Sequence, residues 1–92
     1  MPVRVLIPGP LRRLVGDRAE VELEGATVRE VILALEADAP GLRSKLTNTS
    51  TGEIRRFIRL FLNDEDIDKL GGADTPVKDG DVLTIVPAAA GG

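Results

Sequence analysis

The sequence predicts an α+β domain in which a mixed sheet of four to five strands wraps around one main helix. Short apolar runs with strand character stand near both ends of the chain, and one strong helical pattern lies between them. The chain has 92 residues, which suffices for one domain but is near the lower limit for folding without disulfides or metals. The core must be aliphatic, because the only aromatic residues are Phe57 and Phe61.

The first two strands are predicted to form a hairpin. Residues 3–7 are a β-rich apolar run, and Pro8-Gly9-Pro10 ends this run because no strand continues through such a sequence. Residues 18–23 alternate between apolar and charged side chains, which indicates a strand with one buried face. We expect the two strands to be antiparallel neighbours.

The main helix is predicted over residues 27–38. Thr27 and Glu30 have the spacing of a capping box, in which each side chain accepts from a backbone N–H at the helix start. The helix should end near Asp38, because Ala39 precedes a proline and is biased away from helical angles. One buried stripe follows the i, i+3, i+4, i+7 spacing and consists of Val28, Val31, Ile32 and Leu35.

The second half of the chain is predicted to supply the remaining strands. Residues 55–63 form the clearest core strand, and residues 82–86 form a strand that is apolar on both faces because it has a neighbour on each side. A short edge piece is expected at residues 75–77, since its proline cannot donate to a ladder. Residues 63–66 should form a turn, and residues 47–52 a polar, mobile loop.

The predicted order is strand, strand, helix, strand, short strand, strand. With the last strand returning beside the first, this is the β-grasp, or ubiquitin-like, arrangement. Residues 1–86 would form the domain, and residues 87–92 a flexible Gly-Gly tail that reaches about 20 Å when extended. The two last glycines have no Cβ, so the tip could enter a slot too narrow for other residues.

Composition excludes several classes of protein. Without cysteine or histidine, the chain cannot form disulfides, an ordinary zinc site or a Ser-His nucleophile. A formal charge of −3 and two aromatic residues do not fit a nucleic-acid binder, and no apolar run has membrane-spanning length. No metal site is expected, because Lys69 and Thr75 replace the glycine and glutamate that a calcium loop would need. We expect a cytoplasmic protein with neither nucleic acid nor membrane as a partner.

Four segments resemble the MoaD/ThiS family of ubiquitin-like sulfur carriers. They are residues 63–67, 71–72, 78–81 and 83–92, which contain an Asn-Asp-Glu-Asp turn, a Gly-Gly pair, an Asp-Gly-Asp turn and the final Pro-Ala-Ala-Ala-Gly-Gly. The similarity covers nearly the whole chain and is weakest over residues 42–53. The ending and the Asn-Asp-Glu-Asp turn most resemble the CysO-like branch, which serves cysteine biosynthesis.

The resemblance implies a carrier with no catalytic residues and no bound cofactor. An ATP-dependent activating enzyme would adenylate the terminal carboxylate of Gly92 and convert it to a thiocarboxylate. Gly91 and Ala90 would thread the slim tail into its partners. The sulfur would then pass to a synthase, either a PLP-dependent cysteine synthase or the large subunit of molybdopterin synthase.

An exposed apolar patch is predicted on the open face of the sheet, away from the main helix. Alternation places Phe57, Arg59 and Phe61 on that face if Ile58 and its neighbours face the helix. Such a patch typically binds a partner. The predicted patch is completed by Leu6, Thr84, Val86 and Pro87. The alternative is a satellite core, in which Leu42, Leu46 or the nearby loop covers the phenylalanines.

Two rivals to a sulfur carrier remain open at this point. The same tail and the same adenylation would suit a ubiquitin-like modifier joined through Gly92 to lysines of target proteins. A non-covalent interaction domain, in which Gly-Gly is incidental, is the other. Thiamine thiazole synthesis and tRNA thiolation are further destinations for the sulfur.

Overall fold

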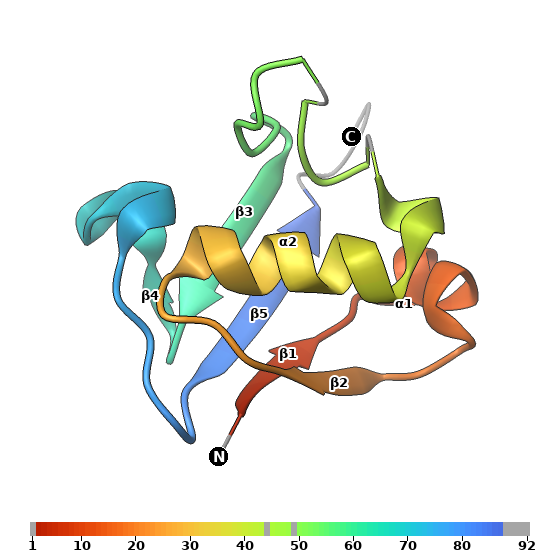
Figure 1. The fold of residues 1–92 in the computed structure, drawn as a ribbon, viewed down its shortest axis with the longest axis horizontal. Helices are drawn as coiled ribbons and strands as arrows, with labels where there is room; N and C mark the ends of the chain where they lie inside the picture. Colours follow the sequence, from red (N-terminus) through yellow and green to blue (C-terminus); the bar gives the residue numbers. More distant parts are fainter. Residues whose placement is uncertain (1, 44, 49, 88–92) are drawn as a thin grey trace.

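The computed structural model describes residues 2–43, 45–48 and 50–87. Figure 1 shows a five-stranded sheet with one long helix lying across one face, which confirms the predicted fold class. The strands are β1 (Val3–Leu6), β2 (Glu20–Leu23), β3 (Ile58–Leu62), β4 (Glu65–Asp66) and β5 (Val82–Pro87). The helices are α1 (Gly9–Arg12) and α2 (Val28–Asp38), with 3₁₀ turns η1 (Arg13–Val15), η2 (Pro40–Leu42), η3 (Ile67–Lys69) and η4 (Gly72–Asp74).

The sheet has the strand order β2-β1-β5-β3-β4. β1 pairs antiparallel with β2 and parallel with β5, and β5 pairs antiparallel with β3. The parallel pair at the centre requires a crossover connection, and α2 lies within that connection. The last strand therefore returns beside the first, as the sequence predicts.

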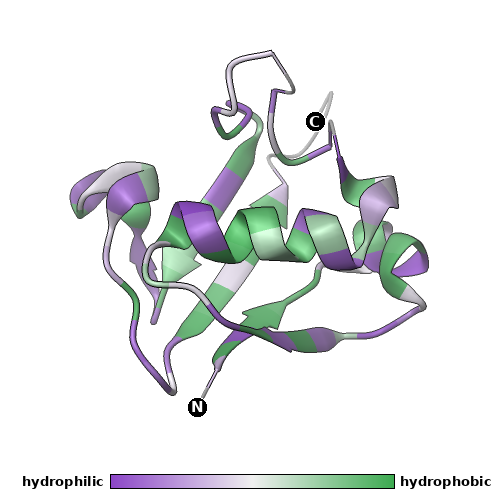
Figure 2. Cartoon of the chain, viewed as in Figure 1, coloured by the Kyte–Doolittle hydropathy of each residue, from purple (hydrophilic) through white to green (hydrophobic). Residues whose placement is uncertain are grey.

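The core lies between α2 and one face of the sheet. All four residues of the predicted helical stripe are buried, and Leu35 has no exposed surface. On β3, Ile58, Leu60 and Leu62 face the same core. Figure 2 shows apolar segments on α2 and on the central strands where they pack together. The aliphatic core predicted from composition is confirmed.

The start of α2 has the predicted cap. The backbone N–H of Glu30 donates to Thr27 Oγ1 at 3.2 Å, and Glu30 Oε1 accepts from the backbone N–H of Ala26 at 2.9 Å. The Glu30 side chain thus reaches one residue beyond the N-cap. The backbone N–H of Val28 donates to the C=O of Thr75 at 3.0 Å, so the cap also joins the helix to a distant segment.

Replacing Thr27 by alanine should lower the free energy of unfolding by about 1 kcal/mol, because a backbone N–H of the first helical turn loses its acceptor. Urea denaturation followed by circular dichroism measures this change. Thr27→Ser keeps the hydroxyl and should retain most of the stability. An unchanged midpoint for Thr27→Ala would contradict a stabilising role for the cap.

The segment after β1 differs from the prediction. The sequence predicts only a strand end at Pro8-Gly9-Pro10, but the structure has α1 and η1 there. Pro10 occupies the second helical position, where the missing N–H costs no helical hydrogen bond. Gly16 then ends η1 in the left-handed conformation, with φ of 69°.

The fifth strand is β4, and the predicted edge strand at residues 75–77 is wrong. Asn63 and Asp64 have φ of 50° and 75°, which form a two-residue hairpin turn of type I′. This tight turn pairs Glu65 and Asp66 with the end of β3. Within residues 75–77, Pro76 forms only an isolated bridge with Thr27.

The segment before β3, predicted to be a mobile loop, is held by several contacts. Thr47 forms a bridge with Ile54, and its hydroxyl donates to the buried Glu36 Oε2 at 2.7 Å. Asn48 Oδ1 accepts from two backbone N–H groups of its own turn, at Ser50 and Thr51. β3 itself begins at residue 58 instead of 55, because residues 55–57 turn before entering the sheet.

Candidate functional site

The end of β5 is where the predicted tail leaves the sheet. Pro87 is the last residue of β5, and its Cα pairs with that of Ile58. The strand is therefore one residue longer than the predicted boundary at residue 86. Ala90, Gly91 and Gly92 lie outside the described residues, so the threading and covalent roles assigned to them remain predictions.

Proline fits the last position of β5 without breaking the ladder. The backbone N–H of Asn63 donates to the C=O of Val82 at 2.8 Å, so residues 82, 84 and 86 direct their backbone groups toward β3. The nitrogen of Pro87 therefore faces the side of β1. Because β1 ends at Leu6, which pairs with Thr84, no strand stands there to receive a hydrogen bond.

The open face of the sheet brings most of the predicted partner patch together. The register pairs Arg59 with Val86 and Phe61 with Thr84, and Thr84 also pairs with Leu6. Directly paired residues on one face have neighbouring side chains. The side chains of this patch therefore cover β3, β5 and the end of β1.

The patch is exposed to different extents. Val86 is 39% exposed, whereas Phe61 and Thr84 are half-buried. Pro87 was predicted to belong to the patch, but it pairs with the core residue Ile58, which places it on the α2 face of the sheet. Phe57 is 48% exposed and lies in the turn before β3 rather than in the strand. A large exposed aromatic at this site marks the patch as a candidate interface.

The predicted satellite core is not formed by Leu42 and Leu46. Both leucines are fully buried in the main core, on the α2 side of the sheet. The other form of that alternative, cover by the nearby loop, is not tested by their burial; Asn48, Thr51 and Ile54 of the loop line one groove with Phe57. Binding of a partner by the patch remains a prediction.

Arg59 has a defined position at the edge of the patch. Its Nη2 donates to Asp66 Oδ2 at 2.8 Å, and Asp66 Oδ1 accepts from the backbone N–H of Asp68 at 2.9 Å. Both oxygens of Asp66 are thus engaged in capping η3 and in orienting the guanidinium. Within the described residues, no group of three or more acidic side chains could hold a metal ion.

Beside the start of β3 the surface is hollowed by two grooves. The larger one has a volume of about 570 Å³ and is lined by four arginines, Arg29, Arg55, Arg56 and Arg59, among others. The last three are close together in the sequence, whereas Arg29 is not. No spacing pattern could have found it, because Arg29 comes from the first turn of α2 and meets the others only through the fold.

Among the described residues, the structure has no helix with the length and apolar character needed to cross a membrane.

The fold and the sheet topology define a ubiquitin-like β-grasp domain. The chain belongs to the ThiS family, which it matches over residues 5–92. This confirms the resemblance seen in the sequence motifs and places the match through the last residue of the chain.

The most informative relatives are sulfur carriers. Sulfur carrier protein CysO of Mycobacterium tuberculosis is 42% identical over 93 residues, which span 100% of both chains. The structure of the BexX/CysO complex of Amycolatopsis orientalis contains a chain that is 44% identical, with a TM-score of 0.89 and coverage of 98% and 99%. Small archaeal modifier protein 3 of Haloferax volcanii is 33% identical over 69 residues, or 75% of this chain and 73% of that one.

The chain is therefore a CysO-like sulfur carrier protein and not an enzyme. Its fold and family agree with the predicted class.

Proposed function

We propose that the C-terminal carboxylate of Gly92 is the site at which this protein carries sulfur. The observation that supports this most strongly is full-length similarity to CysO, together with a family match that extends to residue 92. A covalent sulfur carrier without cysteine also has no thiol to use, which leaves the terminal carboxyl group.

The proposed chemistry takes place on partner enzymes. A carboxylate oxygen of Gly92 attacks the α-phosphorus of ATP and releases pyrophosphate, which gives an acyl-adenylate. A sulfur nucleophile held by the activating enzyme then attacks the acyl carbon, and AMP leaves. If this nucleophile is a persulfide, a thiol reductant then cleaves the S–S bond of the acyl disulfide and forms a new disulfide with the donor, and the product is a thiocarboxylate at residue 92. ATP and sulfur donor both belong to the partner.

The proposed use of the sulfur is cysteine biosynthesis. In this pathway a PLP-dependent synthase would hold an activated serine, whose β-carbon bonds to the sulfur of the thiocarboxylate while its β-oxygen departs with the activating group. The similarity to CysO favours this destination over molybdopterin. Hydrolysis of the resulting acyl bond would then return the carboxylate.

The direct test is the intact mass of the protein isolated from its native host. Replacement of one oxygen by sulfur, localised to residue 92 by fragmentation, supports the proposal. Sulfur found on another residue, or an unmodified chain under conditions of active cysteine synthesis, would contradict it. Co-purification with the synthase identifies the pathway, because a molybdopterin synthase subunit would be recovered instead if that destination were correct.

A protein modifier is a second candidate function, favoured by the similarity to small archaeal modifier protein 3. A modifier would use the same adenylate but transfer the acyl group to a lysine amine. Isopeptide-linked conjugates on an immunoblot, absent from a strain whose copy lacks Gly92, would support this function. The two functions are compatible, since both begin with activation of the tail.

We further propose that the open-face patch binds the activating enzyme through its exposed phenylalanine. Phe57→Ser should weaken binding about tenfold or more, because a half-exposed ring contributes on the order of 1–2 kcal/mol when buried at an interface. Isothermal titration calorimetry with the purified activating enzyme measures the change.

The matched control is Leu33→Ser, since Leu33 is 49% exposed but lies on α2, across the core from the patch. It should bind as the parent chain does. Phe61→Ser extends the test to the strand itself. Weakened binding at an unchanged melting temperature supports an interface, whereas a large drop in melting temperature would return Phe61 to the satellite-core alternative.

A further inference from the structure

The ends of the strands divide the molecule into two poles. Pro87 at the end of β5 lies opposite Ile58 at the start of β3, and Leu6 at the end of β1 lies opposite Glu20. The segments 8–20 and 38–57 therefore gather at the pole from which the tail departs. Arg18 Nη2 contacts Asp38 Oδ2 at 2.9 Å, which joins the two segments. We call this region the tail pole.

The tail pole is basic. Its two segments hold seven basic side chains against four acidic ones, a net side-chain charge of +3 in a chain whose total is −3. Ser44 and Thr49, which are outside the described residues, add no charge. The basic residues of the pole include Arg12, Arg13, Arg43, Lys45, Arg55 and Arg56.

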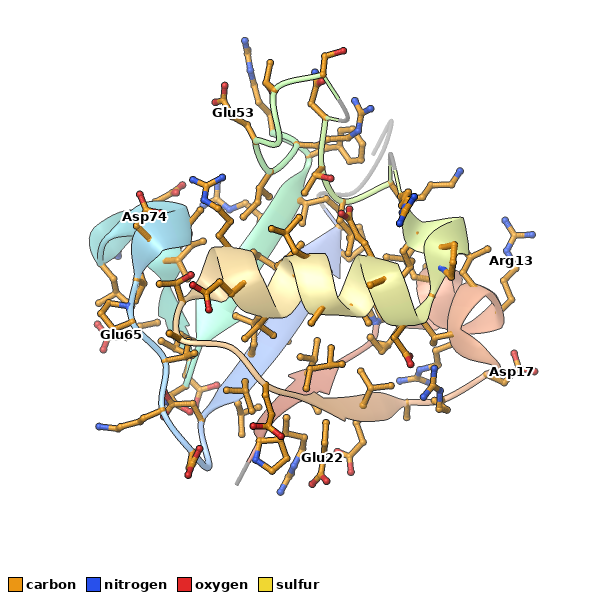
Figure 3. The ribbon with its side chains drawn as sticks, viewed as in Figure 1. Arg13, Asp17, Glu22, Glu53, Glu65 and Asp74 are labelled. Carbon is orange, nitrogen blue, oxygen red and sulfur yellow. The ribbon has the colours of Figure 1, made fainter. Side chains whose placement is uncertain are left out.

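The opposite pole is strongly acidic. The segments 22–30 and 63–81 meet there, since the N–H of Val28 donates to the C=O of Thr75 and the N–H of Val77 to the C=O of Ala26. These segments hold ten acidic side chains against three basic ones, a net charge of −7. Figure 3 shows Glu65 and Asp74 on the side of the molecule opposite Arg13.

The separation of side-chain charge between the two poles is larger than the macrodipole of α2 can cancel. The macrodipole of α2 places about half a negative charge at the tail pole and half a positive charge at the other. This opposes the side chains but is small beside +3 and −7. The molecule is therefore an electric dipole whose positive end lies at the end of the sheet from which the tail departs.

Among the basic residues of the tail pole, Arg56 is well placed to contact a partner. It is exposed, it makes no ion pair with any residue that the structure describes, and it lines both grooves beside the start of β3. The smaller groove, of about 410 Å³, also includes Phe57 of the open-face patch. The basic charge is thus continuous with the patch and adjacent to Ile58, which pairs with the tail root.

We propose that the basic tail pole docks on an acidic rim around the slot of the enzyme that accepts the tail. The proposal rests on the proposed function, because it presumes an enzyme that takes up Gly92. Guanidinium groups pair well with carboxylates, and opposite charges near the binding site raise association rates. The acidic pole orients the molecule by being repelled from the same rim.

A protein rim fits this dipole better than nucleic acid does. A polyanionic strand extends beyond one small pole and would meet the remaining acidic surface, which carries more charge than the tail pole. A local cluster of carboxylates on a partner enzyme meets only the basic pole. The partner chemistry is therefore an Asp- and Glu-rich protein surface.

The test compares two variants with the same change in net charge. Arg56→Glu reverses a charge at the tail pole, and Lys69→Glu does so at the acidic pole, where Lys69 ends η3 and is exposed. Each purified full-length variant is incubated with ATP and extract of the native host at low and at physiological salt. The initial rate of thiocarboxylate formation is followed by intact mass, with sub-saturating carrier.

Arg56→Glu should form thiocarboxylate about threefold to tenfold more slowly at low salt, with a smaller difference at high salt. Arg56→Lys should recover the rate, and Lys69→Glu should be no slower than the parent chain. Equal rates for all variants, or equal slowing by both charge reversals, would overturn the proposal. Loss of the Arg56 effect after RNase treatment would assign the pole to RNA instead. No thiocarboxylate on the parent chain would contradict the proposed function itself.

Discussion

A chain that lacks Gly92 is expected to form no thiocarboxylate and to melt at the same temperature as the full chain. Deletion leaves Gly91 as the new terminus, and its carboxylate falls about 3.5 Å short of the position that Gly92 would reach. Misplacement of a reacting atom by even about 1 Å costs roughly a hundredfold in rate. Intact mass and differential scanning calorimetry on the same sample measure both quantities.

Extension of the chain tests the same claim from the other side. One alanine added after Gly92 converts the reactive carboxylate to an amide and moves the free carboxylate outward, so activation should again fail. Deleting one of the three tail alanines shortens the reach but keeps Gly-Gly, which separates length from the terminal sequence. Sulfur transfer that persists without Gly92 would defeat the assignment of the covalent site.

Replacing Leu35 by alanine is expected to lower the free energy of unfolding by about 2–5 kcal/mol. Leu35 is fully buried beneath α2, and its removal leaves a cavity in a core that has no aromatic residue to fill it. For a domain of this size such a loss is a large share of total stability. Chemical denaturation with a two-state fit gives the change.

Leu33→Ala is the matched control, because the same substitution is made on the same helix at a residue that is 49% exposed. Its effect should be less than about 0.5 kcal/mol, since little burial is lost and alanine has the higher helix propensity. Equal losses for the two variants would mean that helix formation, rather than packing against the sheet, determines stability.

The periodic parts of the fold could be predicted from sequence because burial enforces their periods. The stripe from Val28 to Leu35 and the alternation of Ile58, Leu60 and Leu62 both identify faces that the structure buries. The cap at Thr27 follows from local chemistry alone. The return of the last strand beside the first could be predicted from the connection rules, and the structure shows this pair, β1 and β5, to be parallel.

The errors arise where tertiary contacts decide. Pro10 suggested an end to regular structure, yet proline is accepted at the start of a helix, and Leu11 and Leu14 pack against the core from there. β4 has only two residues, so no period can reveal it; the signal was the Asn63-Asp64 pair, which tolerates positive φ.

The candidate site also has parts that the sequence predicts and parts that depend on the fold. The role of Gly92 stays a prediction from a local motif and a family resemblance, because the tail lies outside the described residues. Alternation along β3 places Arg59 and Phe61 on the open face, but it could not place Phe57, which lies in the turn before the strand. The tail pole could not be predicted, because residues such as Arg13 and Arg56 come together only when the ends of β1 and β3 are brought to the same side.

The proline at the end of β5 restricts the backbone torsions at the point where the chain leaves the sheet. A proline ring holds its own φ near −65°, and its ring restricts Val86, the preceding residue, to extended angles. Two successive residues at the exit thus have little torsional freedom, whatever path residues 88–92 follow. Because the torsions at Val86 and Pro87 are already restricted before a partner binds, these two exit residues lose little conformational entropy when a partner docks on the adjoining surface.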